Sequence, residues 1–155
     1  MVFSLDEELV FPHPLLSDPD GLLAVGGSLS VDRLLLAYRW GIFPWFNDDQ
    51  PILWWWTSPR LMLQPQDVHI SHSLQALLKR KEFTITIDKD FSSVINQCKS
   101  ISRKDQDGTW ILPEMIKAYT RLFHLGFAHS VEVYFENDLV GGLYGVALGK
   151  IFFGE

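Results

Sequence analysis

The clearest alternation of apolar and polar positions lies in the second half of the chain. Residues 83–88 alternate apolar and β-branched side chains, which is typical of a half-buried strand. Residues 129–135 and 139–146 are also strand-like, and the turn-forming segment Glu136-Asn-Asp138 between them predicts a β-hairpin. A third strand-like run covers residues 151–153.

Helical spacing of apolar residues marks other segments. Ser30 is a candidate N-cap for a helix over residues 31–39, and Asp90 opens a helix with Phe91, Val94, Ile95 and Cys98 on one face. Pro113 suits the first position of a helix that runs to His124. Helices followed by a meander predict an α+β fold with a mostly antiparallel sheet.

The first 60 residues differ in character from the rest. Six of the eight prolines lie there, so this stretch can form only short elements joined by turns. We therefore expect a small N-terminal domain rich in Pro and Trp over residues 1–60 and a second domain over residues 61–155. At 47% hydrophobic and 21% charged residues, the composition is that of an ordinary globular protein.

Charge and cysteine content exclude several classes of protein. A net charge of -6 argues against non-specific coating of nucleic acid but permits a local basic patch. The single cysteine excludes an internal disulfide, and no Cys/His spacing suits zinc, so we expect no metal. Met1 is followed by acidic residues, and no long apolar run occurs, so we expect a cytoplasmic protein that does not enter a membrane.

Seven strings carry a resemblance to a known family. They are Asp20-Gly-Leu-Leu-Ala-Val-Gly-Gly27, Ala37-Tyr-Arg-Trp-Gly-Ile-Phe-Pro-Trp-Phe46, Pro51-Ile-Leu-Trp-Trp55, Gly108-Thr-Trp-Ile111, Ala128-His-Ser-Val-Glu132, Leu139-Val-Gly-Gly-Leu-Tyr-Gly145 and Phe152-Phe-Gly-Glu155. In content and order they resemble the signatures of leucyl/phenylalanyl-tRNA-protein transferases. The chain departs from the family pattern at Ser28 and at Trp56-Thr-Ser-Pro-Arg60.

The resemblance implies an enzyme that moves Leu or Phe, and also Met, from aminoacyl-tRNA to the N-terminal Arg or Lys of proteins, which marks them for degradation in the bacterial N-degron pathway. It implies a monomer that needs no cofactor. It also implies a second domain that is similar to acetyltransferases (GNAT-like). Family members continue beyond the Gly-Glu string into Ser-Met-Phe-Ser, a helix and an Asp-x-Gln motif, so this chain resembles a C-terminally truncated member with an incomplete second domain.

The resemblance also assigns residues to an aminoacyl-tRNA site. A deep apolar pocket would accept both Leu and Phe side chains, and Trp45 could stack on the terminal adenine. Glu155 would contact the aminoacyl end or the incoming N-terminal residue and is the candidate catalytic residue. The site residues are Tyr38, Trp45, Trp110, Leu143, Phe152, Gly154 and Glu155. For the rings and Leu143 the alternative is plain core packing, and for Glu155 it is an exposed chain end.

Two basic clusters are candidates for contact with tRNA phosphates. One is Lys79-Arg80-Lys81, which follows a helix that begins at Ser71 or Ser73, and the other comprises Lys99, Arg103 and Lys104. A solvated charged face is the alternative for both. His129 lies in an alternating strand, where a structural hydrogen bond is favoured over catalysis.

Two other functions stay open from the sequence. One is an acyl-coenzyme A dependent N-acetyltransferase of the same fold, although the usual pyrophosphate-binding turn, Arg/Gln-x-x-Gly-x-Gly/Ala, is missing. The other is a non-catalytic fragment that binds tRNA or peptide.

Overall fold

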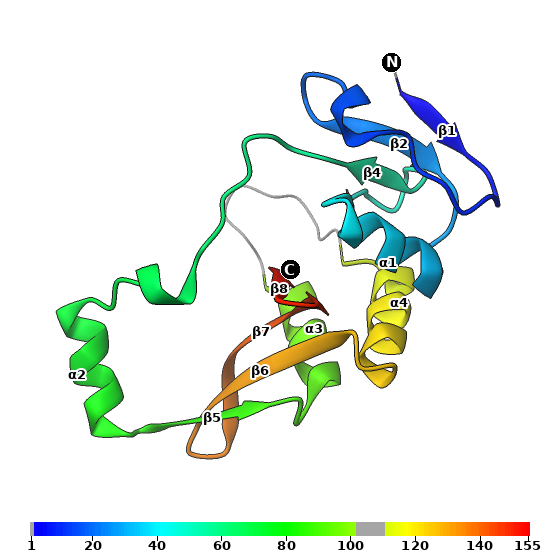
Figure 1. Cartoon of the computed structure of the whole chain (residues 1–155). Helices are drawn as coiled ribbons and strands as arrows, with labels where there is room; N and C mark the ends of the chain where they lie inside the picture. Colours follow the sequence, from blue (N-terminus) through cyan, green and yellow to red (C-terminus); the bar gives the residue numbers. More distant parts are fainter. Residues whose placement is uncertain (1, 102–110) are drawn as a thin grey trace.

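The computed structural model describes residues 2–101 and 111–155 and contains two sheets with helices between and around them (Figure 1). The first sheet has the strand order β1-β2-β4-β3. Its strands are β1 (Phe3–Leu5), β2 (Leu22–Gly26), β3 (Phe43–Pro44) and β4 (Leu53–Trp55). β1 and β2 are parallel and the other pairs are antiparallel. The strands are short, as the density of prolines in this region predicts.

Helix α1 (Val31–Arg39) follows β2 and confirms the helix expected over residues 31–39. The Ser30 hydroxyl accepts a hydrogen bond from the Arg33 backbone N–H at 3.3 Å, as an N-cap should. Leu34, Leu35 and Tyr38 lie on the buried side of the helix. The cap and the apolar stripe together turn Tyr38 toward the second half of the chain.

The second sheet is antiparallel throughout, with the order β5-β6-β7-β8. Its strands are β5 (Phe83–Ile87), β6 (Ala128–Phe135), β7 (Asp138–Leu148) and β8 (Ile151–Gly154). The predicted hairpin is confirmed as β6–β7, and the α+β class is confirmed as well. β8 is an edge strand of the described sheet, so one of its sides has no neighbouring strand there.

Helices α3 (Phe91–Ser100) and α4 (Pro113–His124) pack against β6 and β7 and cover one face of this sheet (Figure 1). The Asp90 side chain accepts from the Ser93 N–H at 3.0 Å and caps α3, as its position predicts. Tyr144 and Val146 point to the covered face and are buried. The opposite face, which we call the open face, exposes Ile85 and Ile87.

Helix α2 (His72–Arg80) stands away from the rest of the molecule (Figure 1). Ser71 is its N-cap, which settles the choice between Ser71 and Ser73. The basic cluster does not follow the helix as expected, because Lys79 and Arg80 form its last turn and Lys81 is the left-handed C-cap with φ 55°. Positive side chains are favourable at this end because the helix dipole is negative there.

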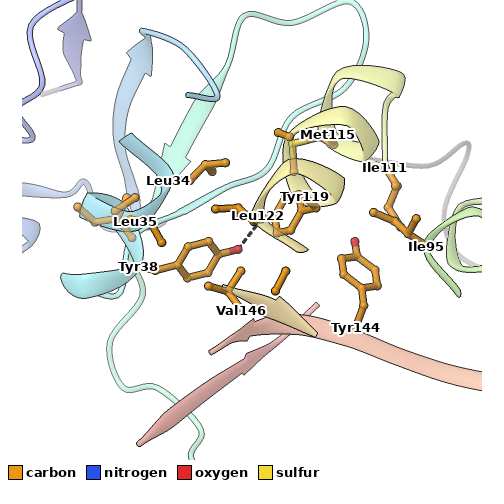
Figure 2. Close-up of a cluster of buried hydrophobic side chains, with 14 of the residues drawn as sticks. Leu34, Leu35, Tyr38, Ile95, Ile111, Met115, Tyr119, Leu122, Tyr144 and Val146 are labelled. Atoms are coloured by element: carbon orange, nitrogen blue, oxygen red, sulfur yellow. Dashed lines mark hydrogen bonds between the residues drawn. The ribbon is translucent and has the colours of Figure 1, made fainter. Parts of the chain in front are cut away.

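The two sheets share one continuous hydrophobic core, which reaches from Leu23 and Trp54 in the first sheet to Tyr144 and Val146 in the second. Figure 2 shows the centre of this core, where the side chains of α1 and α4 meet above β7. Two single-turn 3₁₀ helices, η1 (Pro14–Leu16) and η2 (Pro65–Asp67), lie outside it. Among residues 2–101 and 111–155, no helix combines the length and apolar character needed to span a membrane.

Candidate active site

The carboxyl group of Glu155 is held by Tyr38, whose hydroxyl is in turn bonded to that of Tyr119. The Glu155 backbone N–H donates to the Tyr144 carbonyl oxygen at 3.0 Å, which extends the β7–β8 pairing to the residue after β8. Tyr38 in α1 donates its hydroxyl proton to Glu155 Oε1, and the Tyr38 and Tyr119 hydroxyl groups are also hydrogen-bonded to each other. A phenol has one proton, so Tyr119 must be the donor to Tyr38. We call Tyr38, Tyr119 and Glu155 the tyrosine–glutamate network.

Packing of rings fixes this network. Figure 2 shows the Tyr38 hydroxyl pointing at Tyr119 across the contact between α1 and α4. The ring centroids of Tyr38 and Phe153 are 5.1 Å apart, and those of Tyr119 and Tyr144 are 5.8 Å apart at an interplanar angle of 81°. The first contact is tilted and the second is edge-to-face, and such contacts favour defined ring orientations. Tyr38 therefore presents its hydroxyl to Glu155 in a defined orientation.

The surroundings of Glu155 shift its proton affinity. Burial raises the pKa of the Glu155 carboxyl from 4.5 to about 7, and the hydrogen bond from Tyr38 and the positive charge of Arg60 oppose that rise. Burial also raises the pKa of the Tyr38 and Tyr119 phenols well above 10, so both stay protonated donors. A carboxyl group with a pKa near neutrality can accept and release a proton at physiological pH.

Arg60 supplies the cation of the site, and sequence reasoning did not assign it a role. Its guanidinium carbon lies 5.0 Å from the centroid of the Phe43 ring and 6.0 Å from that of Phe153, and its Nη1 donates to the Gly41 carbonyl oxygen. Cation–π contacts with two rings hold the charge near Glu155. The available signal was weak: one arginine in an aromatic-rich stretch that also departs from the family pattern.

A second group of expected site residues gathers on the open face of the β7–β8 pair. Gly145 pairs with Gly154, and Ala147 pairs with Phe152, so Leu143, Phe152 and Gly154 face the same side. The Phe152 ring lies over Gly145, since a Cβ placed there would be 2.6 Å from Phe152 Cζ. We call Leu143, Phe152 and Gly154 the β7–β8 cluster. Leu143 and Phe152 are 44% and 45% exposed, so the cluster is open to a ligand.

The tyrosine–glutamate network and the β7–β8 cluster lie on opposite sides of the same strand pair. Tyr38 is only 2% exposed and belongs to the core, so it can act on a ligand only through Glu155. Phe152 and Gly154 face the other way from Glu155, because successive residues of a strand alternate.

Trp45 directly follows β3 of the first sheet, and its backbone N–H donates to the Leu53 carbonyl oxygen in β4. Its ring is 47% exposed and packs at 5.7 Å from the Trp55 ring, whose indole N–H donates to the Trp45 carbonyl oxygen at 2.7 Å. This leaves an exposed indole face that could stack on a base.

The remaining predicted residues are dispersed or undescribed. Lys79, Arg80 and Lys81 are exposed at the end of α2, whereas Lys99 is half-buried in the last turn of α3. Trp110, Arg103 and Lys104 lie outside the described residues. In the described ranges, no three His, Cys, Asp or Glu side chains are grouped in a way that could hold a metal ion.

Comparisons with known proteins place this arrangement in a family. A family model described as Leucyl/phenylalanyl-tRNA protein transferase matches residues 62–155, and the model of the N-terminal domain of the same proteins matches residues 27–59. The two matches cover strands β3 and β4 of the first sheet and all four strands of the second, so both halves of the chain match models of one class of transferases. The chain belongs to the leucyl/phenylalanyl-tRNA-protein transferase family.

Individual relatives agree along almost the whole chain. It is 56% identical over 154 residues to the leucyl/phenylalanyl-tRNA–protein transferase of Syntrophobacter fumaroxidans, which covers 99% of this chain and 66% of that protein. The Thermodesulfovibrio yellowstonii protein of the same name is 56% identical over 153 residues, covering 99% of this chain and 62% of its own length. The chain therefore spans slightly less than two thirds of these curated relatives.

Proposed function

We propose that this protein transfers Leu or Phe from aminoacyl-tRNA to the N-terminal amine of acceptor proteins. The observation that carries the proposal is the Glu155 carboxyl group, which accepts from Tyr38 near the Arg60 cation, together with an exposed apolar cluster on the opposite face of β8. The apolar side chain of the donor would lie on the β7–β8 cluster. Trp45, with its exposed ring, and Trp110 would contact the terminal adenosine.

The reaction follows from the chemistry of an aminoacyl ester. The acceptor amine nitrogen attacks the ester carbonyl carbon, the new C–N bond forms, and the bond from that carbon to the ribose 3′-oxygen breaks. Glu155, the catalytic residue, takes the proton from the amine and passes it to the 3′-oxygen. Tyr38 is a positioning residue, because it holds the Glu155 carboxylate in one orientation from the core.

Finer features of the function are part of the same proposal. The acceptors are proteins that begin with Arg or Lys, the donors include Met, and the reaction serves the N-degron pathway in the cytoplasm. The protein acts as a monomer, and its residues 61–155 form the acetyltransferase-like domain while residues 1–60 form the smaller one. In support, α3 and α4 cover one face of an antiparallel sheet, and the net charge of -6 suits a cationic acceptor.

A transfer assay tests the proposal directly. The protein is incubated with tRNA charged with labelled Phe and with a peptide that begins with Arg, and we expect a labelled peptide with no added cofactor. A peptide whose N-terminus is acetylated is the matched control and should stay unlabelled. Acetylation of the Arg peptide from acetyl coenzyme A would instead establish an N-acetyltransferase, and tRNA binding without any product would establish a binding fragment.

The basic end of α2 is proposed to contact phosphates of the tRNA acceptor stem, together with the cluster Lys99, Arg103 and Lys104. We expect the combined change Lys79→Gln, Arg80→Gln and Lys81→Asn to weaken tRNA binding and to lower the salt slope of log K by about 1 for each phosphate that is no longer neutralised. Asn suits position 81 because that residue is left-handed. Affinity is measured from about 50 to 300 mM salt, a range that includes the ionic strength of about 0.1 M at which the Debye length is about 10 Å.

Removal of three cations elsewhere provides the control for that experiment. Lys117, Arg121 and Lys150 are exposed on α4 and after β7, and changing them to Gln alters the net charge equally. If both triple variants weaken tRNA binding to the same degree, the effect is one of overall charge and α2 does not contact the tRNA.

A further inference from the structure

The Arg60 guanidinium and the Glu155 carboxyl group lie on the same side of β8. Phe153 and Glu155 are two positions apart along an extended chain, so their side chains point the same way. Tyr38 contacts both, because its ring lies 5.1 Å from that of Phe153 while its hydroxyl donates to Glu155. The guanidinium carbon of Arg60 lies 6.0 Å from the centroid of the same Phe153 ring. A ligand group that reaches Glu155 from this side is therefore also near a positive charge.

Arg60 is held in place by contacts that leave N–H groups available. The Phe43 ring of the first sheet, at 5.0 Å, and the Phe153 ring of the second sheet both contact the guanidinium. Its Nη1 donates to the Gly41 carbonyl oxygen. A guanidinium carries five N–H donors and no acceptor. Because Arg60 is exposed, its other N–H groups can meet an oxygen atom of a ligand.

Arg60 and Glu155 influence each other without forming an ion pair. The charge of Arg60 opposes the rise in the pKa of Glu155. No N···O distance of 4.0 Å or less joins the two side chains, both of which belong to the described residues. The carboxyl group instead accepts from Tyr38. The guanidinium is thus near the base of the proposed reaction and is not neutralised by it.

The proposed reaction develops negative charge on one oxygen atom. When the acceptor nitrogen adds to the ester carbonyl carbon, the C–N bond forms and the carbonyl π electrons move onto oxygen, while Glu155 takes the proton of the amine. The oxyanion then returns its electron pair to carbon, the bond to the ribose 3′-oxygen breaks, and that oxygen takes the proton from Glu155. Donors directed at such an oxyanion are usually the largest single contribution to catalysis of acyl transfer.

We infer that Arg60 is a second catalytic residue, whose guanidinium N–H groups bind the oxyanion of the tetrahedral intermediate formed beside Glu155. This inference rests on the proposed function and adds a residue to it. Hydrogen bonds from a charged donor strengthen as the acceptor becomes an anion, and Arg stays charged at all relevant pH values. The contacts with Phe43 and Phe153 position the guanidinium before the charge develops. Glu155 then moves the proton, and Arg60 stabilises the charge.

Two stable mimics that differ in geometry at the reacting atom test this inference. The planar one is the phenylalanyl amide of 3′-amino-3′-deoxyadenosine. The tetrahedral one is the α-aminophosphonate analogue of phenylalanine esterified to the adenosine 3′-oxygen, which carries an anionic oxygen in place of the carbonyl. We expect Arg60→Gln to weaken binding of the phosphonate about 100-fold and of the amide at most about threefold, because one donor to an oxyanion contributes about 10²- to 10³-fold. Isothermal titration calorimetry measures both affinities.

Two further variants provide the comparisons. Arg60→Lys keeps a cation beside the two rings but replaces the planar fork by a single ammonium group, so we expect a smaller loss of phosphonate affinity than in Arg60→Gln. Arg121→Gln removes the same charge from the exposed surface of α4. It should bind both compounds as the unchanged protein does.

Transfer kinetics give a readout that an effect on Glu155 alone would not produce. Loss of the Arg60 charge also raises the pKa of Glu155, which by itself moves the pH profile of transfer to higher pH and leaves its upper plateau unchanged. If Arg60 binds the oxyanion, the plateau of kcat in Arg60→Gln should itself fall about 100-fold. The KM for Phe-tRNA should change little, because the intermediate and not the bound donor loses its hydrogen bond.

The outcomes separate this inference from the proposed function. If the unchanged protein transfers Phe and Arg60→Gln only shifts the pH profile, the inference is wrong and the proposed function stands. An equal weakening for the phosphonate and the amide would also overturn it, since Arg60 would then serve ground-state binding or folding. A higher KM for Phe-tRNA with an unchanged kcat plateau would overturn it in favour of a contact with a tRNA phosphate. If the unchanged protein makes no labelled peptide, the proposed function fails and the inference fails with it.

Discussion

Replacing Glu155 by Gln should lower the rate of Phe transfer about 100-fold while leaving the fold intact. Gln has the same shape and can still accept the hydrogen bond from Tyr38 through its amide oxygen. It cannot take the proton of the acceptor amine, and loss of a general base costs about 10²- to 10⁴-fold in rate. The measurement is kcat/KM for transfer from Phe-tRNA to an Arg-initiated peptide. Glu7→Gln, an exposed residue near the N-terminus, is the control with the same charge change.

The pH profile gives the same prediction an independent readout. Transfer by the unchanged protein should increase as the pH rises through about 7, because Glu155 acts as a base only when ionised. In Tyr38→Phe the hydrogen bond that lowers the pKa of Glu155 is removed, so the profile should move to higher pH. If the unchanged protein, Tyr38→Phe and Glu155→Gln all gave the same pH profile, Glu155 would not be the base of this reaction.

The stability of the protein should also depend on the ionisation of Glu155, but it should fall as the pH rises, whereas the transfer rate should increase. The pKa of Glu155 is raised from 4.5 to about 7, so between these values the folded state binds a proton that the unfolded state has released. The free energy of unfolding therefore falls as the pH rises through this window, by up to about 1.4 kcal/mol per pH unit. The lowered pKa values of Asp90 and Glu132 act only at lower pH. Urea unfolding at pH 5 and 7.5 should show the decrease in the unchanged protein and little of it in Glu155→Gln.

Local patterns were sufficient for most elements of the fold. The alternation at residues 83–88, the Ser30 and Asp90 caps and the Pro113 start all correspond to observed elements, because each depends on neighbours within one turn or one strand. The first sheet was not predicted in detail. Its pairings join β1 to β2 and β2 to β4 across long stretches of chain, and strands of two to five residues leave little periodicity to detect.

The candidate site was harder still to predict from local patterns, because its residues come from distant segments. Tyr119 was predicted only as part of the helix from Pro113 to His124, yet its hydroxyl is hydrogen-bonded to that of Tyr38, which is 81 positions away in sequence. Alternation along β8 puts Phe152 and Glu155 on opposite sides of the strand, but the pairing with β7 decides which side faces the helices. Arg60 is positioned by the rings of Phe43 in β3 and Phe153 in β8, which lie on strands far apart in sequence. Contacts between distant segments, and not residue types alone, assemble this site.

Replacing Gly145 by Ala should destabilise the protein by about 3 kcal/mol, with a fall in Tm of about 6–12 °C. A Cβ at this position would lie 2.1 Å from the Phe153 carbonyl oxygen and 2.6 Å from Phe152 Cζ. The oxygen belongs to the backbone and cannot move aside unless β8 separates from β7. The same separation would displace Phe152 from the β7–β8 cluster and shift Glu155, which follows β8. Binding of the phenylalanyl amide of 3′-amino-3′-deoxyadenosine, a stable mimic of the aminoacyl-tRNA end, should therefore fall together with stability.

Gly141→Ala is the matched control for this prediction, because Gly141 lies on the same strand and the same face as Gly145. A Cβ there would meet only Val133 Cβ at 3.7 Å, an ordinary van der Waals contact. We expect its Tm to stay within about 2 °C of the unchanged protein, since Ala is no worse than Gly in a strand interior. If Gly145→Ala unfolds at the same temperature as Gly141→Ala, then β7 and β8 do not approach each other as closely as described. The register that places the β7–β8 cluster on one side and Glu155 on the other would then be wrong.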